Sequence, residues 1–243
     1  AGANDRLWAA IRDAMRAAGL AAPDALTRGA DDLWPEWTDP GLALSQTCGF
    51  PYRARLHGRV TLIGTPDYGV EGCAPGWYRS VFVARADDPR ADVAQFDGAR
   101  FAFNEGMSQS GWAAPQTHAA RLGIALRGTC QTGGHRLSAL AVAEGRADLA
   151  ALDAVTWRMI HRWDAVAAQL RVVGLTAPTP GLPLIAARAA EGAQMFGIVA
   201  AAIAAMSAAD RDVTGLRGIV AIPAEEYLAV PTPAAPQELA QLS

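Results

Sequence analysis

The chain has 243 residues, of which 51% are hydrophobic and 19% charged, and its formal net charge is −3. This composition is typical of a globular protein with one large domain or two smaller ones, and it gives no electrostatic reason to expect nucleic acid as a partner. All 21 basic residues are arginine. The absence of lysine excludes lysine-based chemistry such as a Schiff base or a phosphate-binding P-loop.

Two further features bear on the class of protein. The most apolar run, residues 195–206, is shorter than the roughly 20 residues that a membrane span needs, so it predicts a buried helix. The three cysteines, Cys48, Cys73 and Cys130, contain no CxxC pair, so we expect no metal site. One disulfide with one thiol, or three buried thiols, would both fit this count.

The first third of the chain predicts one helix and then strands. Leu7, Ile11 and Met15 recur at fourfold spacing and predict an amphipathic helix, with Asn4 as its cap and Gly19 as its end. Short apolar runs rich in β-formers then predict buried strands. These predicted strands cover residues 42–44, 60–63, 78–84 and 101–103.

Helices and strands alternate in the next part of the chain. The predicted helices cover residues 111–122 and 135–145, with a third after Asp153, and the predicted strands cover residues 124–126, 149–152 and 170–175. This alternation predicts an α/β fold with a mostly parallel sheet and helices on both of its faces.

The proline-rich residues 177–183 break this alternation and predict a crossover or hinge. A strand at 184–186, the alanine-rich helix, a strand at 219–222 and a short helix should follow, and residues 231–236 should be irregular.

The stretch from Asn104 to Trp112 lies between a predicted strand and a predicted helix. Within it, Ser108, Ser110 and Gly111 place hydroxyl groups and unpaired backbone amides at a helix N-terminus, which carries a partial positive charge. Such a helix start can bind an anion. A serine in this position more often serves only as a helix cap, so the motif alone leaves both interpretations open.

Two other junctions repeat this arrangement. His135 opens a predicted helix after a Gly-Gly loop, and Asp153 lies between an apolar strand and a helix. Taken singly, the histidine is best explained as a solvated loop residue and the aspartate as a helix cap. Because an open α/β sheet binds its ligand at the carboxyl ends of its strands, the three junctions together predict a pocket.

Three runs of sequence contain these junctions: ARFAFNEGMSQSGW, TGGHRLSALAVAEGRADLAALDAVTW and LRVVGLTAPTPGLPLIAAR. They resemble the phosphate/phosphite/phosphonate-binding proteins of ABC importers, and the likeness extends from residue 45 to the last helix. It implies the type II periplasmic-binding-protein fold, with two α/β lobes, a mostly parallel sheet in each lobe and the ligand in the cleft between them. Lobe 1 would comprise residues 1–80 and 177–243, and lobe 2 residues 81–176.

The resemblance also implies the residues that bind the ligand. The serine-rich turn would grip the oxyanion, and His135 would donate another hydrogen bond to it. Asp153 would accept a hydrogen bond from a protonated ligand oxygen or from a ligand amino group. Tyr78 in the second lobe and Gln46 or Thr47 in the first would close the other side. The full implied set is Gln46, Thr47, Tyr78, Ser108, Gln109, Ser110, Gly111, His135 and Asp153.

The implied function is that of the solute-binding component of an ABC importer, which captures a small oxyanion by cleft closure. No catalysis, cofactor, metal or nucleic acid is implied; the partner would be a membrane permease, and the protein a monomer in the periplasm. The sequence shows no signal peptide, which leaves a cytoplasmic location open. A ligand-sensing domain, or a binder of a sulfonate or a thiamine-precursor pyrimidine, is the alternative.

An enzyme that uses His135, Asp153 and a serine is a competing hypothesis. The sequence has no G-x-S-x-G nucleophile elbow, and both residues stand where helix caps stand, which disfavours it.

Overall fold

A computed structural model describes residues 2–29 and 32–236. The chain forms two compact units. Of the described residues, unit 1 comprises 2–29, 32–76 and 180–227, and unit 2 comprises 77–179 and 228–236. Each unit has its own sheet and its own hydrophobic core.

The last described residues correct the division expected from the sequence, which placed all of 177–243 in lobe 1. Residues 228–236 belong to unit 2 instead. This proline-rich stretch has little regular structure of its own, and Trp112 of unit 2 donates a hydrogen bond from Nε1 to the Ala234 carbonyl at 3.0 Å. Residues 228–236 therefore belong with unit 2, in which this hydrogen bond is made, although the residues before them belong to unit 1.

Unit 1 is built around a sheet with the strand order β1-β10-β2-β11. Its elements are α1 (Ala3–Ala17), α2 (Trp34–Trp37), β1 (Ser45–Gln46), α3 (Gly49–Pro51), η1 (Tyr52–Leu56), β2 (Val60–Asp67), β10 (Leu184–Ala187), α7 (Gly192–Ala204), α8 (Ala208–Thr214), β11 (Gly218–Val220) and α9 (Ala224–Leu228).

The sheet of unit 1 corrects one detail of the expected fold, because all its neighbouring strands pair antiparallel in the described residues. The β10–α7–β11 connection does join two strands that point the same way, as a βαβ unit does. However, β2 lies between these two strands and runs opposite to both. The alternation of elements was therefore predicted correctly, but it does not report which strands become neighbours.

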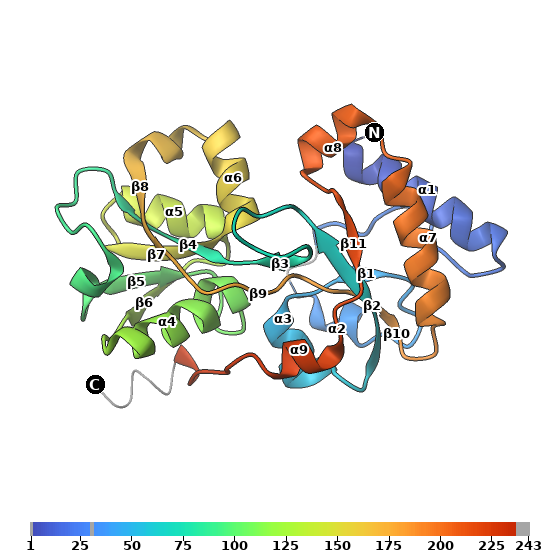
Figure 1. The fold of residues 1–243 in the computed structure, drawn as a ribbon, viewed down its shortest axis with the longest axis horizontal. Helices are drawn as coiled ribbons and strands as arrows, with labels where there is room; N and C mark the ends of the chain where they lie inside the picture. The colour runs from blue at the N-terminus through green and yellow to red at the C-terminus, as the bar shows by residue number, and fades with distance from the viewer. Residues whose placement is uncertain (1, 30–31, 237–243) are drawn as a thin grey trace. The chain divides into compact units, whose positions relative to one another are not determined.

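One face of this sheet is covered by α1 and α7, which lie next to each other in Figure 1. Ile11 and Met15 of α1 pack with Val199 and Ile203 of α7, as the fourfold spacing predicted. The helix starts earlier than expected, at Ala3, and Gly2 rather than Asn4 precedes it. The Gly2 amide donates to the Asp5 carboxylate at 3.0 Å, and this bond fixes the first turn.

Unit 2 has a five-stranded sheet in the order β6-β5-β7-β4-β8. Its elements are β3 (Trp77–Tyr78), β4 (Ser80–Arg85), η2 (Val93–Phe96), β5 (Arg100–Phe103), η3 (Gln109–Ala113), α4 (Ala114–Leu122), β6 (Arg127–Gln131), α5 (His135–Ala143), β7 (Leu149–Asp153), α6 (Ala154–Trp163), η4 (Ala165–Gln169) and β8 (Leu170–Leu175). The strand β3 pairs separately with β9 (Thr179–Pro180).

In this sheet β5 is parallel to β6 and β7, whereas β4 runs antiparallel to both of its neighbours, β7 and β8. The expectation of a mostly parallel sheet is therefore wrong for this unit too, because half of the strand pairs in its described residues are antiparallel. The helices α5 and α6 cover one face and α4 covers the other (Figure 1). Alternate residues of each strand point to opposite faces. Thus Val81 and Val83 pack with α5, whereas Phe82 faces His118 of α4 at a ring distance of 5.2 Å.

Two predicted strands are displaced. The strand expected at residues 124–126 begins at Arg127, because the Ile124 amide closes the end of α4 by donating to the Ala119 carbonyl. The strand expected at residues 42–44 does not form, and β1 follows it at Ser45–Gln46. The Leu42 carbonyl nevertheless accepts a hydrogen bond from the Ala187 amide.

Within the described part of the chain, no single helix is long and apolar enough to cross a membrane; α7 and α8 meet the length and composition criteria only as a pair bent by 109°. The three cysteines are half-buried thiols, so a disulfide is not formed in this structure.

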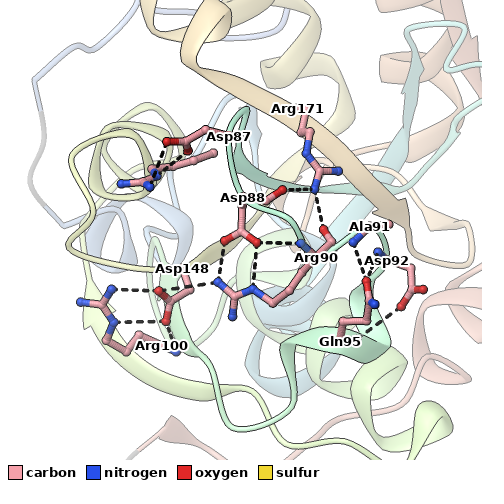
Figure 2. Close-up of polar contacts among 10 residues, drawn as sticks. Asp87, Asp88, Arg90, Ala91, Asp92, Gln95, Arg100, Asp148 and Arg171 are labelled. Atoms are coloured by element: carbon pink, nitrogen blue, oxygen red, sulfur yellow. Dashed lines mark hydrogen bonds and ion pairs between the residues drawn. The ribbon is translucent and has the colours of Figure 1, made fainter.

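The strand directions give the unit 2 sheet two distinct ends. At its amino end, where β5 and β7 begin and β4 finishes, Figure 2 shows an ion-pair network. Asp88 accepts hydrogen bonds from Arg90 at 2.6 and 2.9 Å, and Asp148 accepts them from Arg100 at 2.8 and 3.1 Å. The Arg90 guanidinium lowers the pKa of Asp88 to about 2. Arg171 donates to the carbonyl groups of Asp88 and Arg90.

Candidate functional site

The candidate site lies at the opposite, carboxyl end of the unit 2 sheet. Here Asn104 follows β5, the loop before His135 follows β6, and Asp153 is the last residue of β7. Because β4 runs antiparallel to β7, its first residue Ser80 is the register partner of Asp153. The strand order therefore brings these junctions to one end of the sheet, as the sequence predicted.

The serine-rich turn starts the helical segment that continues into α4. The Ser108 Oγ atom accepts a hydrogen bond from the Gly111 amide at 2.9 Å, so Ser108 is the helix cap. The Ser108 carbonyl accepts from both Trp112 and Ala113, and the bond from Ala113 makes the first turn a wide, π-type turn. Among the described residues the Ser110 amide has no acceptor. It is a donor at the positive end of a helix.

Glycine is required at position 111. A Cβ atom there would lie 1.8 Å from Oδ1 of Asn104 and 3.2 Å from Oγ of Ser108. The Asn104 side chain therefore lies directly against the first turn. Its Oδ1 atom is buried and makes no hydrogen bond with the described residues, which costs free energy in a folded protein.

His135 contacts the turn through its side chain. Its Nε2 atom lies 2.9 Å from Oγ of Ser110, whose side chain is buried. Burial of the ring lowers the pKa of His135 to about 4, an effect that the nearby Ala151 carbonyl partly opposes. The imidazole is therefore neutral at pH 7. Its Nδ1 atom is buried and has no hydrogen bond of normal geometry in the described part of the chain.

Asp153 has two structural tasks at this end of the sheet. Its Oδ1 atom accepts hydrogen bonds from the amides of Val155 and Thr156, at 2.7 and 2.9 Å, and so caps α6. The carboxyl group is also buried, and this burial raises the pKa of Asp153 above its ordinary value. A buried carboxyl group of this kind favours a neighbour that brings a proton.

Two further contacts fix the positions of the serine turn and the His135 loop. Ser80 donates from Oγ to the Ser110 carbonyl at 2.9 Å, which ties the turn to the start of β4. Thr132 contacts the end of β5 through the Phe103 carbonyl, and the Gly133 amide donates to the Asn104 carbonyl at 2.9 Å. Gly133 has φ +83°, a conformation that suits glycine in this tight loop.

The remaining predicted residues are distributed over both units. Gln109 is buried in the first turn, and Tyr78 is buried in β3, two residues before Ser80. Gln46 and Thr47 belong to unit 1. There the Gln46 side chain donates to the Leu182 carbonyl at 3.1 Å, and the Thr47 amide donates to the Pro183 carbonyl at 3.0 Å. Their contribution to a ligand site stays a prediction.

Asn104 and Ser80 were not predicted as site residues. Asn104 stands immediately after a strand, in the position from which the other candidates were recognised, so its location was a usable signal. Ser80 gave no such signal, because it lies at the start of a strand. It is close to the other candidates because β4 runs antiparallel to β7. Trp112 is completely buried beside Phe103 and is a core residue.

No group of three or more metal-ligating side chains occurs in residues 2–29 and 32–236. The carboxyl end of the sheet instead gathers neutral hydroxyl, amide and imidazole groups with one buried carboxyl group. These groups suit a small polar ligand held by hydrogen bonds.

Solved structures similar to this chain share its fold. A Xanthomonas citri protein bound to ATP is 17% identical with a TM-score of 0.69, covering 97% of this chain and 93% of its own. A phosphonate-transporter binding protein from Pseudomonas aeruginosa is 17% identical with a TM-score of 0.67, covering 91% and 77%. PhnD1 from Prochlorococcus marinus, in complex with methylphosphonate, is 17% identical with a TM-score of 0.62, covering 76% and 74%.

These neighbours establish a two-lobed periplasmic-binding-protein fold, in agreement with the expected fold class. No curated protein sequence is significantly similar to the chain. Residues 47–227, however, match the model of one family, described as the periplasmic substrate-binding protein of the phosphonate ABC transporter. The chain therefore belongs to the phosphonate ABC transporter family of periplasmic substrate-binding proteins, whose role is to bind a solute for import.

Proposed function

We propose that this protein captures a phosphonate-type oxyanion, namely phosphate, phosphite or a phosphonate, and delivers it unchanged to an ABC permease. The observation that carries the proposal is the turn at Ser108–Gly111. Its Ser110 amide points from a helix N-terminus without an acceptor in the described residues, and the Ser110 hydroxyl lies beside it. Amide and hydroxyl donors at a helix start are the groups that bind phosphate-like anions.

The geometry disfavours an enzyme built on the same side chains. A Ser-His-Asp triad needs an aspartate that accepts the Nδ1 proton of the histidine. Nδ1 of His135 has no such partner in the described chain, and Asp153 directs Oδ1 to the amides of α6. A histidine with a pKa of about 4 is also a weak base at pH 7. We therefore include the absence of catalysis in the proposal.

Asp153 gives the proposed site a preference among anions. A carboxylate next to an anion is repulsive unless a proton lies between the two oxygens. Phosphate, phosphite and phosphonates can carry such a proton near neutral pH, whereas sulfate cannot. The preference requires the ionised carboxyl group of Asp153, which the Val155 and Thr156 amides favour against the burial that raises its pKa. The proposed selectivity is thus protonated oxyanion over sulfate.

A calorimetric titration of extensively dialysed protein with phosphate, phosphite, methylphosphonate and sulfate tests both parts. We expect at least one of the three phosphorus oxyanions to bind with micromolar or lower Kd, and sulfate to bind at least roughly tenfold more weakly. Failure of all four to bind would reject the proposed function. Equal affinity for sulfate and phosphate would reject the role of Asp153 alone.

The variant Asp153→Asn refines this test. Asn keeps an oxygen that can accept from the Val155 and Thr156 amides, so the start of α6 should be preserved. Because the charge is gone, we expect the gap between sulfate and phosphate to narrow. An unchanged gap in a folded variant would contradict the proposed role.

We further propose that the protein works as a monomer in the periplasm with a membrane permease as its partner. Membership of the periplasmic substrate-binding family supports the location and the kind of partner.

A further inference from the structure

The described chain passes between the two units three times. It leaves unit 1 after Gly76, returns at Pro180, and leaves again after Tyr227. The first two passages are joined by hydrogen bonds, because β3 pairs with β9 and the Gly181 amide donates to the Gly76 carbonyl at 2.8 Å. The third passage leads into residues 228–236, which contain no strand. We call residues 228–236 the C-terminal strap.

The start of the C-terminal strap is fixed in the core of unit 1. Tyr227, the residue before it, is 1% exposed, and its hydroxyl group shares a hydrogen bond with the hydroxyl group of Thr65 in β2. The Tyr227 ring also packs against the Tyr52 ring at a centroid distance of 5.2 Å. A tyrosine that is both buried and hydrogen-bonded holds the chain in place at this point.

The far end of the C-terminal strap is fixed to the helical turn that carries the proposed anion-binding donors. Trp112 follows Gly111 in this turn, and its indole Nε1 atom donates to the Ala234 carbonyl at 3.0 Å. Pro236 lies against Gly106, where a Cβ atom would come within 3.1 Å of the proline ring. Trp112 is completely buried, and a buried indole N–H group is stabilised by an acceptor. The strap supplies that acceptor.

The C-terminal strap has little slack between its two fixed ends. Six residues, 228–233, separate Tyr227 from Ala234, and two of them are proline. Each proline fixes φ at about −65° and favours an extended chain, which lowers the number of conformations open to so short a segment. The strap therefore resists a displacement of Trp112 relative to Tyr227.

We propose that the C-terminal strap positions the ligand-binding turn, and that ligand binding and strap docking are coupled. The docked strap holds the Trp112 indole and so keeps the Ser110 amide, two residues earlier, in its binding position. Because coupling between two binding events is reciprocal, a ligand that binds this turn tightens the docking of the strap by the same factor. This proposal rests on the proposed oxyanion-binding function. The strap itself is a positioning element and does not contact the ligand.

A longer strap tests the proposal in the full chain. A flexible Gly-Ser insertion of about ten residues between Ala229 and Val230 keeps every anchoring residue but lowers the effective concentration of the strap's far end at Trp112. Calorimetry with methylphosphonate, phosphite and phosphate would compare this variant with the wild type. We expect the affinity for the oxyanion that binds best to fall roughly two- to tenfold, the range for one hydrogen bond. Unchanged affinity would overturn the proposal.

Two controls accompany the long-strap variant. The same insertion after Gly58, in an exposed turn of unit 1, should leave the affinity unchanged. Ser110→Ala removes a hydroxyl donor from the ligand-binding turn. It should weaken binding roughly tenfold or more, the range for a hydrogen bond to a charged group.

The variant Trp112→Phe replaces the long strap if the insertion prevents folding. Phenylalanine keeps an aromatic ring beside Phe103 and loses the donor to the Ala234 carbonyl. We expect the same two- to tenfold loss of affinity, and binding as tight as that of the wild type would overturn the proposal.

Hydrogen exchange of the tryptophan indoles supplies a readout that a purely structural strap would not change. The Nε1 groups of Trp8 and Trp37 are buried in unit 1, have no acceptor among the described residues, and report stabilisation of the whole fold. Saturating the wild type with the oxyanion that binds best should slow exchange at Trp112 at least roughly twofold more than at these two. Equal slowing at all three indoles would overturn the proposal.

Failure of the strap and failure of the proposed function give different results. If the wild type binds none of the three oxyanions, the proposed function fails. If the wild type binds, and Ser110→Ala weakens binding while the long strap does not, only the role of the strap fails.

Discussion

The two ends of the unit 2 sheet use polar residues in different ways. At the amino end, the charges are matched: Arg90 pairs with Asp88, and Arg100 pairs with Asp148 (Figure 2). At the carboxyl end, the polar groups are mostly neutral and buried, and several lack partners among the described residues. Those without partners include the Ser110 amide and Asn104 Oδ1.

Within one sheet, the residues that stabilise the fold and the residues proposed to bind the ligand thus lie at opposite ends. Paired and partly exposed charges cost little and hold the strand starts together. Buried groups without partners cost free energy, and they persist where they have another task. We therefore expect changes at the carboxyl end to alter ligand affinity and its pH dependence, and changes at the amino end to alter only stability.

Enlarging Gly111 should produce the largest effect. In Gly111→Ala the new methyl group would meet Asn104 Oδ1 at 1.8 Å, so either the turn or the Asn104 side chain must move. We expect affinity for the best phosphorus oxyanion to fall by more than about 100-fold, and stability to fall by about 1–3 kcal/mol. Calorimetry and thermal unfolding measure the two effects.

Gly197 of α7 is the matched control. A Cβ atom there meets nothing within 4 Å, and the residue lies inside a helix. Gly197→Ala should therefore stabilise the protein by about 1 kcal/mol and leave affinity unchanged. If Gly111→Ala bound ligand as well as the wild type, the carboxyl end would not be the site.

Acid should lower the free energy of unfolding in two separate pH ranges, one set by His135 at the carboxyl end and one by Asp88 at the amino end. His135 has a pKa of about 4 in the folded protein against an ordinary value of 6.5. Its lowered pKa supports folding above pH 6.5, and this stability is lost as the pH falls from 6.5 to about 4, by at most about 3 kcal/mol. For Asp88, with a pKa of about 2 against 3.8, the corresponding loss occurs only between pH 3.8 and 2.

Chemical denaturation at a series of pH values would resolve these ranges. In the variant His135→Gln, the loss of stability between pH 6.5 and 4 should disappear, and the loss at lower pH should remain. If the variant still lost stability between pH 6.5 and 4, another group would titrate there, and the burial assigned to His135 would be wrong.

The smallest effect is expected from Arg100→Gln at the amino end. The Arg100 side chain is half exposed, so its ion pair with Asp148 is screened by solvent. We expect a slightly lower Tm at low salt, a smaller difference at high salt, and unchanged affinity for phosphorus oxyanions. A change in affinity comparable with that of Ser110→Ala would remove the distinction between the two ends.

The sequence predicted which residues lie at the carboxyl end of the sheet, because the signals for strands and helix caps are local. Asp153 stands between an apolar strand and a helix, and Ser108 caps a helix, so both positions follow from short-range rules. The alternation of elements then placed these junctions at one end of a sheet.

What depends on contacts between distant residues was not predictable in this way. The Ser110–His135 bond and the Ser80 bond to the Ser110 carbonyl join residues far apart in the sequence. The same holds for unit 1, where β2 lies between β10 and β11, and for residues 228–236, which join unit 2. Neither apolar periodicity nor helix caps report such pairings.

The most direct test of the central claim is an NMR titration of labelled protein with methylphosphonate, with amide shifts followed residue by residue. We predict that the Ser110 amide shows the largest downfield shift, that His135 responds with it, and that the Arg100 and Asp148 amides do not move. Saturable binding whose largest shifts fall at the amino end, or outside Ser108–Gly111 and His135 altogether, would contradict it.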